Sequence, residues 1–176
     1  AYINSKLKII QFLKKNGSII INNEDIFLKK IVKVFEKDKK IEFISKINRN
    51  KLNNSNLNGY HNLINCSLAI KLCELLNVKK INIYDAINSF VNLPHRMEKV
   101  FSSKEILIIN DSKATNGESA AAALSSYKNI FWIAGGISKE DGIGNAINKM
   151  QEVKHIILIG KSKQKFKKQI TNKNFK

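Results

Sequence analysis

The chain has 176 residues, and 43% of them are hydrophobic, which suits one or two domains with a packed core and excludes fibrous and disordered classes. Its two cysteines, Cys66 and Cys73, provide neither a disulfide framework nor a CxxC metal pair, so we expect a reducing, cytoplasmic compartment. No apolar run approaches the roughly 20 residues of a membrane span, and the first residues do not have the pattern of a signal peptide. We therefore expect no membrane contact.

The formal net charge of +17 favours a nucleic-acid partner, because basic surfaces release counterions from phosphate backbones. However, only two of the 31 basic residues are arginine, and the lysines are scattered among abundant Ile and Asn, whose codons are also A/T-rich. Aromatic residues do not alternate with the basic ones as they do in base-stacking surfaces. Genomic drift toward A/T-rich codons explains the positive charge at least as well as a nucleic-acid partner does. We expect no nucleic-acid partner and keep a basic nucleic-acid-binding module as an alternative.

Apolar periodicity and turn residues predict the elements of the first half of the chain. In chain order these are a helix over 2–15, a strand over 18–22, a helix over 26–35, a strand over 41–45, a polar loop over 46–58, and helices over 63–76 and 84–90. The only proline, Pro94, marks a change of pattern. We place the domain boundary there, with domains over 1–92 and 93–176.

Beyond this boundary, short apolar runs alternate with helical stretches. The predicted strands cover 105–110, 129–136 and 155–160, and the predicted helices cover 116–127, 143–153 and 162–170. Such alternation is typical of βαβ units on a parallel sheet. We therefore predict an α/β fold with a mostly parallel sheet.

Ligands of open α/β sheets bind beyond the carboxyl ends of the strands, so the loops after the first two of these strands are candidate sites. Residues 110–116 place Asp111, Lys113 and Thr115 directly ahead of a helix, and Thr115 with Glu118 has the pattern of a capping box. The N–H groups at such a helix start suit an anion. Each residue alone is better explained as a turn or cap residue, but the cluster as a whole favours a binding site.

The second loop covers residues 135–142. It combines glycines that permit close approach of a ligand with the ammonium group of Lys139, which suits a carboxylate or a phosphate. A solvated loop is an equally good interpretation of the same residues.

Lys6 falls between Ile10 and Leu13 on the apolar arc of the first predicted helix. A lysine there extends to solvent, pairs with an acid, or loses its charge through desolvation. A neutral amine can react with carbon dioxide and form a carbamate, which is an anion that binds metals. Extension to solvent is the commonest outcome for a single lysine.

Two further groups of polar residues lie near the predicted boundary. His61, Asn62 and Asn65 occupy a helix start, where Asn62 can cap and His61 can donate to an oxygen. Arg96 follows His95, and its guanidinium can stack on a base or bind phosphate. The histidines lack HxxxH-like spacing, so we expect no zinc site made by the protein alone.

Four segments, in this order, resemble the Mur ligase family: residues 59–69 (GYHNLINCSLA), 93–100 (LPHRMEKV), 109–116 (INDSKATN) and 134–142 (AGGISKEDG). The HNxxN and HRxE patterns are shared across that family, whereas NDSKATN is similar to the branch that adds D-glutamate. The opening YINSK is similar to a YxxxK segment of the same branch. The resemblance covers nearly the whole chain but lacks the family's uridine-binding domain, its P-loop and its final segment.

The resemblance implies a fragment of an ATP-dependent, ADP-forming amide ligase of peptidoglycan precursor synthesis. Residues 1–92 would be the second half of the central ATP-binding domain, and 93–176 a truncated, Rossmann-like C-terminal domain. In the family reaction, ATP with Mg²⁺ phosphorylates the carboxylate of UDP-N-acetylmuramoyl-L-alanine, and the amine of D-glutamate then displaces phosphate. The resemblance also implies a monomer. A sister ligase that adds another amino acid is the second alternative, against which NDSKATN counts.

The resemblance also implies site residues, position by position. Lys6 matches a catalytic lysine that is carbamylated to support magnesium. The residues that match nucleotide-contacting positions are His61, Asn62, Asn65, Arg96 and Asp111, of which Asp111 suits ribose hydroxyls. Thr115 and Lys139 match groups that hold the D-glutamate carboxylate, and Lys113 matches a catalytic lysine near the reacting centre. Glu140 stands where the family often has glycine, which bears on the shape of the D-glutamate loop. Without a P-loop, we expect the chain alone to be inactive.

Overall fold

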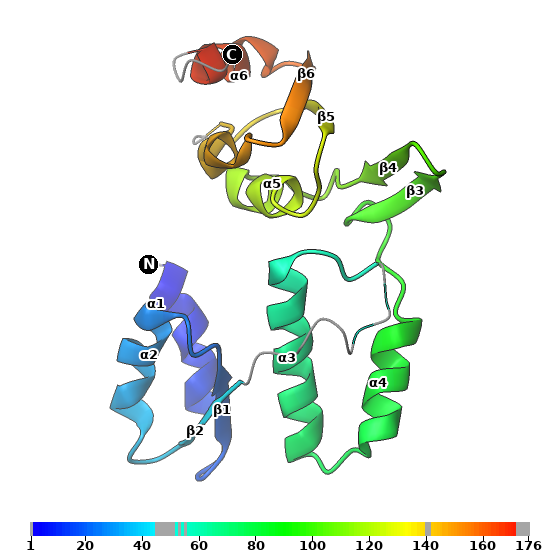
Figure 1. Cartoon of the computed structure of the whole chain (residues 1–176). Helices are drawn as coiled ribbons and strands as arrows, with labels where there is room; N and C mark the ends of the chain where they lie inside the picture. Colours follow the sequence, from blue (N-terminus) through cyan, green and yellow to red (C-terminus); the bar gives the residue numbers. More distant parts are fainter. Residues whose placement is uncertain (1, 45–51, 53, 55, 140–141, 172–176) are drawn as a thin grey trace. The chain divides into compact units, whose positions relative to one another are not determined.

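The computed structural model describes residues 2–44, 52, 54, 56–139 and 142–171 (Figure 1). The chain divides into two compact units, of which the first comprises residues 1–53 and 63–89 and the second comprises residues 54–62 and 90–176. The segment 54–62 thus groups with the C-terminal half, although it precedes the predicted domain boundary. That boundary stays a prediction. The predicted polar loop over 46–58 lies partly outside the described residues.

The first unit contains helices and a two-stranded sheet. Its elements are α1 (Tyr2–Leu7), the 3₁₀ helix η1 (Lys8–Phe12), β1 (Ser18–Ile21), α2 (Ile26–Val32), the 3₁₀ helix η2 (Lys33–Phe35), β2 (Lys40–Phe43), most of α3 (Tyr60–Leu75) and α4 (Lys80–Ser89). Strands β1 and β2 are parallel, with Ser18 opposite Lys40. They are joined through α2, which begins where the Asp25 carboxylate accepts a hydrogen bond from the Leu28 N–H at 2.9 Å.

The first predicted helix is shorter in the structure, because α-helical geometry lasts six residues and the 3₁₀ turns of η1 end at Phe12. The helical stretch ends where Leu13 turns to an extended backbone, before the stop that the Asn-Gly sequence predicts, and Asn16 adopts a left-handed φ of 62° in the turn that follows. The Nζ atom of Lys39 donates hydrogen bonds to the carbonyls of Leu13 and Lys14 at 2.6 and 2.9 Å. These bonds attach the segment that follows η1 to the residue before β2.

The second unit carries the remaining strands and helices. Besides the first residues of α3, its elements are β3 (Glu98–Ser102), β4 (Leu107–Asn110), α5 (Gly117–Leu124), β5 (Ile130–Gly135), the 3₁₀ helix η4 (Gly144–Lys149), β6 (Val153–Ile159) and α6 (Lys163–Thr171). Strands β5 and β6 are parallel and joined through η4, whereas β3 and β4 form an antiparallel hairpin. The fold is therefore α/β with small, mostly parallel sheets, as predicted.

Two features of this unit differ from the prediction. Strand β3 was not among the predicted elements, and within the described residues β4 pairs with it rather than with β5. The predicted helix over 143–153 is a 3₁₀ helix of six residues. Gly142 and Gly144 lie at its start with φ values of 62° and 49°, which an α-helix does not accommodate.

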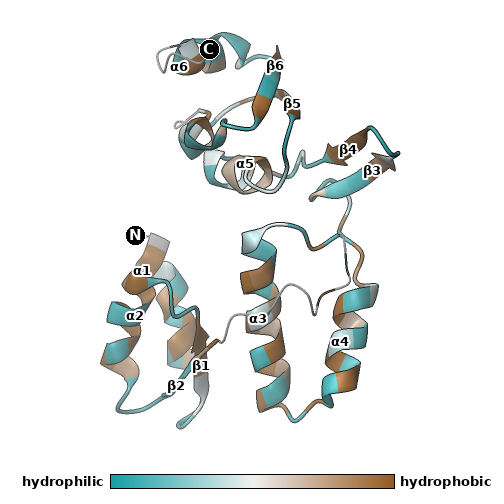
Figure 2. Ribbon diagram, in the orientation of Figure 1, coloured by the Kyte–Doolittle hydropathy of each residue, from teal (hydrophilic) through white to brown (hydrophobic). Residues whose placement is uncertain are grey.

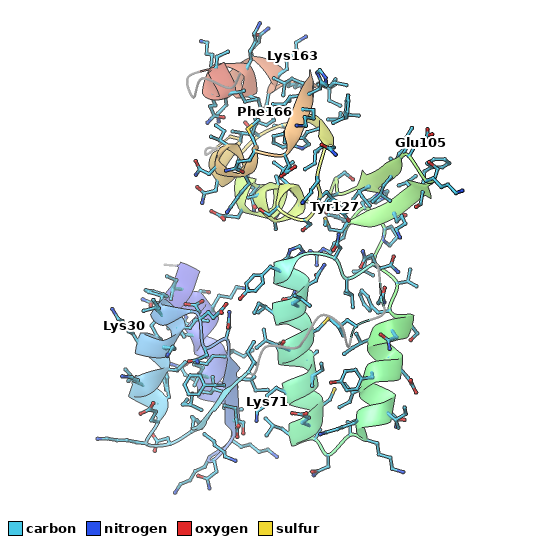
Figure 3. All side chains as sticks on the ribbon, in the orientation of Figure 1. Lys30, Lys71, Glu105, Tyr127, Lys163 and Phe166 are labelled. Atoms are coloured by element: carbon cyan, nitrogen blue, oxygen red, sulfur yellow. The ribbon has the colours of Figure 1, made fainter. Side chains whose placement is uncertain are left out.

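The core of the second unit lies beside β5 and β6. Its buried residues are Leu124, Ile143, Ala146, Met150, Val153, Phe166 and Ile170, of which Phe166 is labelled in Figure 3. Trp132 of β5 and Leu158 of β6 pack against this cluster. The residue before each of them in its strand, Phe131 or Ile157, is exposed. This alternation is the period of two expected for strands with one covered face.

Exposed apolar residues also occur on the β3–β4 hairpin, where Figure 2 shows hydrophobic colouring on β4. Leu107 and Ile108 of that strand are 43% and 50% exposed. Among the described residues, no helix has the length and apolarity needed to cross a bilayer.

Candidate functional site

Arg96 lies in the turn that precedes β3. The two residues beside it, His95 and Met97, have left-handed φ values of 64° and 48°, which non-glycine residues rarely adopt. Met97 is buried, and its backbone N–H donates a hydrogen bond to Oδ1 of Asp111 at 2.9 Å. Because Asp111 directly follows β4, this bond ties the turn to the end of that strand. The arginine and the carboxylate therefore belong to one local structure.

Asp111 also interacts electrostatically with Arg96 and His61, all within the second unit. Burial raises the pKa of Asp111 above its ordinary value of 3.8, and the Met97 N–H, His61 and Arg96 each oppose that rise. Burial lowers the pKa of His61 below 6.5, against the charge of Asp111. His61 is therefore mainly neutral at pH 7, so its ring offers one donor and one acceptor beside a carboxylate that accepts. Sugar hydroxyls and a heterocyclic base are ligands of that chemistry.

The start of α3, which carries His61, contacts the segment that follows α5. Nδ2 of Asn58 donates a hydrogen bond to the carbonyl of Ser126 at 3.1 Å. Gly59 has a φ of 90°, and any side chain there would meet the Ser126 hydroxyl and the His61 ring. Asn62 does not cap the helix as predicted, because α3 begins two residues earlier; its Nδ2 donates to the Asn58 carbonyl at 2.7 Å.

Tyr127 belongs to the same group of residues and is not evident from the sequence. Its half-buried phenol follows α5 (labelled in Figure 3). Burial and the charge of Asp111 raise the pKa of Tyr127, whereas a hydrogen bond with Asn58 lowers it. Since Asn58 and Tyr127 are far apart along the chain and have no motif in common, only the folded structure reveals this contact.

The predicted capping box of Thr115 and Glu118 is wrong. The N-cap of α5 is Asn116, whose Oδ1 accepts a hydrogen bond from the Ser119 N–H at 2.8 Å. Glu118 instead accepts a hydrogen bond from the side chain of Asn145. Thr115 is exposed, and its hydroxyl does not serve as the cap. The helix start is therefore capped without using Thr115, which was also predicted to contact a ligand.

The two lysines predicted to contact an anion are both exposed. The backbone N–H of Lys113 donates to the carbonyl of His95 at 2.9 Å, which fixes Lys113 beside the turn that carries the arginine. In the loop after β5, the carbonyl of Lys139 accepts a hydrogen bond from Nζ of Lys165 at 3.0 Å. Glu140, the departure from the family pattern, lies outside the described residues.

Lys6 and Asn65 belong to the first unit. Lys6 is exposed on α1, so its place on the apolar arc of the sequence does not bury its ammonium group. Asn65 is exposed on α3, one helical turn after His61. Among the described residues, no three His, Cys, Asp or Glu side chains are grouped to hold a metal ion. Mg²⁺ is usually held by one or two carboxylates together with phosphates of a substrate, so a carbamate on Lys6 would be one ligand of a shared site rather than part of a site made by the protein alone.

Residues 95–175, which contain the Arg96 turn and both loops, match the family described as Mur ligase, glutamate ligase domain. The UDP-N-acetylmuramoylalanine–D-glutamate ligase of Rickettsia felis is 31% identical over 97% of this chain, which covers 43% of that protein. The protein of the same name in Rhizobium meliloti is 43% identical over 62% of this chain and 24% of its own length. The chain belongs to the Mur ligase family.

Solved Mur ligase structures share the fold. MurF from Acinetobacter baumannii aligns with a TM-score of 0.68 at 16% identity, covering 91% of this chain and 42% of that chain. UDP-N-acetylmuramate-alanine ligase MurC from Thermotoga maritima aligns with a TM-score of 0.53 at 18% identity, covering 66% of this chain and 28% of that chain. At such identities the likeness establishes the fold alone. The chain spans less than half the length of each of these relatives.

Proposed function

We propose that this chain is part of a ligase that adds D-glutamate to UDP-N-acetylmuramoyl-L-alanine with ATP in peptidoglycan precursor synthesis. The observation that carries the proposal is the grouping of His61, Arg96 and Asp111 in the second unit. Arg96 and Asp111 lie within residues 95–175, which match the family. The names of the curated relatives, which are ligases for D-glutamate, support the choice of amino acid. The NDSKATN loop after β4 points to the same branch.

The grouped residues serve the nucleoside of ATP in this proposal. The Asp111 carboxylate accepts hydrogen bonds from ribose hydroxyls, and it is held for this by the Met97 N–H. The guanidinium of Arg96 stacks on the base or pairs with a phosphate, and the neutral ring of His61 offers a donor and an acceptor. Asn62 and Asn65 supply amide groups on the same helix.

The exposed groups serve the reacting end. ATP transfers its terminal phosphoryl group to the carboxylate of UDP-N-acetylmuramoyl-L-alanine, which gives ADP and an acyl phosphate. The amine of D-glutamate then forms a C–N bond at the acyl carbon, and the C–O bond to phosphate breaks as the tetrahedral intermediate collapses. Lys113 offsets the developing negative charge, while the Thr115 hydroxyl and the Lys139 ammonium hold the D-glutamate carboxylate.

Magnesium, when bound, offsets the charge of the phosphates. In this proposal Lys6, as a carbamate, would supply one anionic ligand to the ion beside the phosphates of ATP. The carbamate has a direct test: protein exposed to ¹³C-bicarbonate should show a carbamate carbon resonance that is absent from the Lys6→Arg variant. Its persistence in that variant would assign the modification to another lysine.

Nucleotide binding by the 176-residue chain tests the role of the second unit. ATP is titrated into the chain by calorimetry, and we expect Arg96→Ala and Asp111→Asn to weaken binding by about tenfold or more, as loss of a charged hydrogen bond does. Lys104→Ala, an exposed site between β3 and β4, is the control and should bind as the unaltered chain does. Equal affinities in all four proteins would refute the nucleotide site.

The reaction needs a second experiment, because the chain covers less than half of its relatives. A chimera carries these 176 residues in place of the matching segment of the Rickettsia felis protein. Phosphate release from ATP should require UDP-N-acetylmuramoyl-L-alanine and D-glutamate together. Release with a different amino acid would instead favour a sister ligase, and a chimera that folds but releases phosphate with none would contradict the assignment.

A further inference from the structure

The turn that carries Arg96 has an unusual backbone. Arg96 stands between two non-glycine residues, His95 and Met97, whose φ values of 64° and 48° fall in the left-handed region. In that region the Cβ atom approaches the following carbonyl oxygen, so an L-residue remains there only when its surroundings hold it. Something outside the turn must therefore supply the contacts that keep both residues in place.

For His95 those contacts come from the β3–β4 hairpin, whereas Met97 bonds to Asp111 through its N–H and to Asn92 Nδ2 through its carbonyl, both at 2.9 Å. Glu98 Oε2 accepts a hydrogen bond from the His95 backbone N–H at 2.8 Å, and Asn110 Nδ2 lies 2.8 Å from Nδ1 of the His95 ring. The same Asn110 Nδ2 lies 3.5 Å from Glu98 Oε2. Glu98 and Asn110 face each other across the hairpin as register partners, which brings their side chains together on one face.

The same turn also holds Lys113 and Asp111, two residues of the proposed site. The His95 carbonyl accepts the Lys113 N–H at 2.9 Å, and the Met97 N–H is bonded to Asp111 at 2.9 Å. One change of conformation at His95 would therefore displace the arginine, the carboxylate and the lysine together.

We infer that Glu98 and Asn110 are positioning residues, which hold the turn at residues 93–97 so that Arg96 and Asp111 face one nucleotide. The nucleotide part of this inference rests on the proposed function. The side chain of Glu98 is 36% exposed and that of His95 is 55% exposed, so neither contributes much to a hydrophobic core. Losing the Glu98 carboxylate should change the shape of the turn and leave the fold intact.

The first experiment measures the turn without nucleotide, by amide NMR of the unaltered chain and of Glu98→Ala. We expect the amide resonances of His95 and Met97 to shift and their hydrogen exchange to accelerate in Glu98→Ala. Glu98→Gln keeps an oxygen that can accept the His95 N–H and should largely preserve both resonances. Glu105→Ala removes a carboxylate at the far end of the same hairpin, labelled in Figure 3, and is the matched control. Unchanged His95 and Met97 resonances in Glu98→Ala would overturn the inference.

The second experiment adds ATP to the same variants and uses glycine to isolate the backbone effect. We expect Glu98→Ala to weaken ATP binding by about five- to tenfold, with Glu98→Gln and Glu105→Ala close to the unaltered chain. Glycine adopts positive φ without a steric penalty, so His95→Gly should restore much of the affinity that Glu98→Ala loses. If Glu98→Ala weakens ATP binding by the same factor in the unaltered chain and in the His95→Gly variant, the carboxylate does not act through the His95 backbone.

The outcomes separate the inference from the proposed function. If Arg96→Ala weakens ATP binding but Glu98→Ala leaves it unchanged, the site stands and the positioning role fails. If the NMR changes occur but the unaltered chain does not bind ATP, the contacts that shape the turn stand and the nucleotide role fails. A Glu98→Gln variant as weak as Glu98→Ala would assign the effect to charge and would also overturn the positioning role.

Discussion

Gly117, the first residue of α5, allows the closest approach between that helix and the start of η4. A Cβ atom added to Gly117 would lie 2.5 Å from the Ile143 carbonyl oxygen, 2.7 Å from Gly144 Cα and 2.9 Å from the Asn145 nitrogen. All three are backbone atoms, so no side chain can rotate away to make room. We therefore expect Gly117→Ala to push η4 away from α5.

The size of the effect follows from two opposing contributions. Replacing a helical glycine by alanine in a relaxed site stabilises a protein by about 0.4 to 1 kcal/mol through the unfolded state. Overpacking against atoms that cannot yield costs about 1 to 3 kcal/mol. The middle of each range gives a net loss of about 1.3 kcal/mol. For the second unit, which comprises residues 54–62 and 90–176, that corresponds to a fall in Tm of about 5 to 10 °C.

The single tryptophan makes this measurement local. Trp132 lies in β5 and packs against the core of the second unit, so its fluorescence reports the unfolding of that unit in urea. Ser119→Ala, an exposed site in the first turn of the same helix, is the control and should change stability by less than about 0.5 kcal/mol. A Gly117→Ala midpoint equal to or above that of the unaltered chain would refute the close approach of α5 and η4.

Three further predictions concern the same unit. In urea titrations, Asn116→Ala should cost about 1 kcal/mol by removing the N-cap of α5, and Thr115→Ala should cost much less; a larger loss in Thr115→Ala than in Asn116→Ala would assign the cap to Thr115. Phe166→Ala should cost about 3 kcal/mol or more, and a loss below about 1 kcal/mol would contradict its place in the core. By NMR titration His61 should show a pKa below 6.5, and Asp111→Asn should lower that pKa further because a favourable negative charge is removed. A rise in the pKa of His61 in Asp111→Asn would contradict the interaction between the two side chains.

The sequence predicts β4, β5 and β6 well because each is a short apolar run bounded by polar residues or glycine. β5 and β6 lie within about two residues of their predicted limits. β3 escapes prediction because EKVFS has little apolar content and owes its strand geometry to pairing with β4. The choice between Thr115 and Asn116 as the cap also escapes, because both residue types cap helices and only the path of the chain decides between them.

The candidate site also contains residues that the sequence predicts and contacts that it does not. Arg96, Asp111, Lys113 and Lys139 stand out by chemical type and by their place after strands or beside the proline. The contact between Asn58 and the segment after α5 has no local pattern, since it joins residues that only tertiary structure brings together. Lys6 shows what helical periodicity leaves open: its place on an apolar arc allows extension to solvent, pairing or loss of charge, and in the structure the residue is exposed.

Asn58 donates its side-chain amide to the Ser126 carbonyl and immediately precedes Gly59. Asparagine followed by glycine is the dipeptide whose side-chain amide hydrolyses most readily. Glycine has no side chain to hinder the attack of its backbone nitrogen on the side-chain carbonyl of the asparagine. Hydrolysis would place an acidic oxygen where the Nδ2 donor was, opposite a carbonyl oxygen and close to the Tyr127 phenol. Ageing of a purified sample would then loosen the start of α3 with no change in the gene. Asn-Gly also occurs at residues 16–17 and 116–117, so a peptide map that locates the hydrolysed amide is part of any nucleotide-binding measurement on this protein.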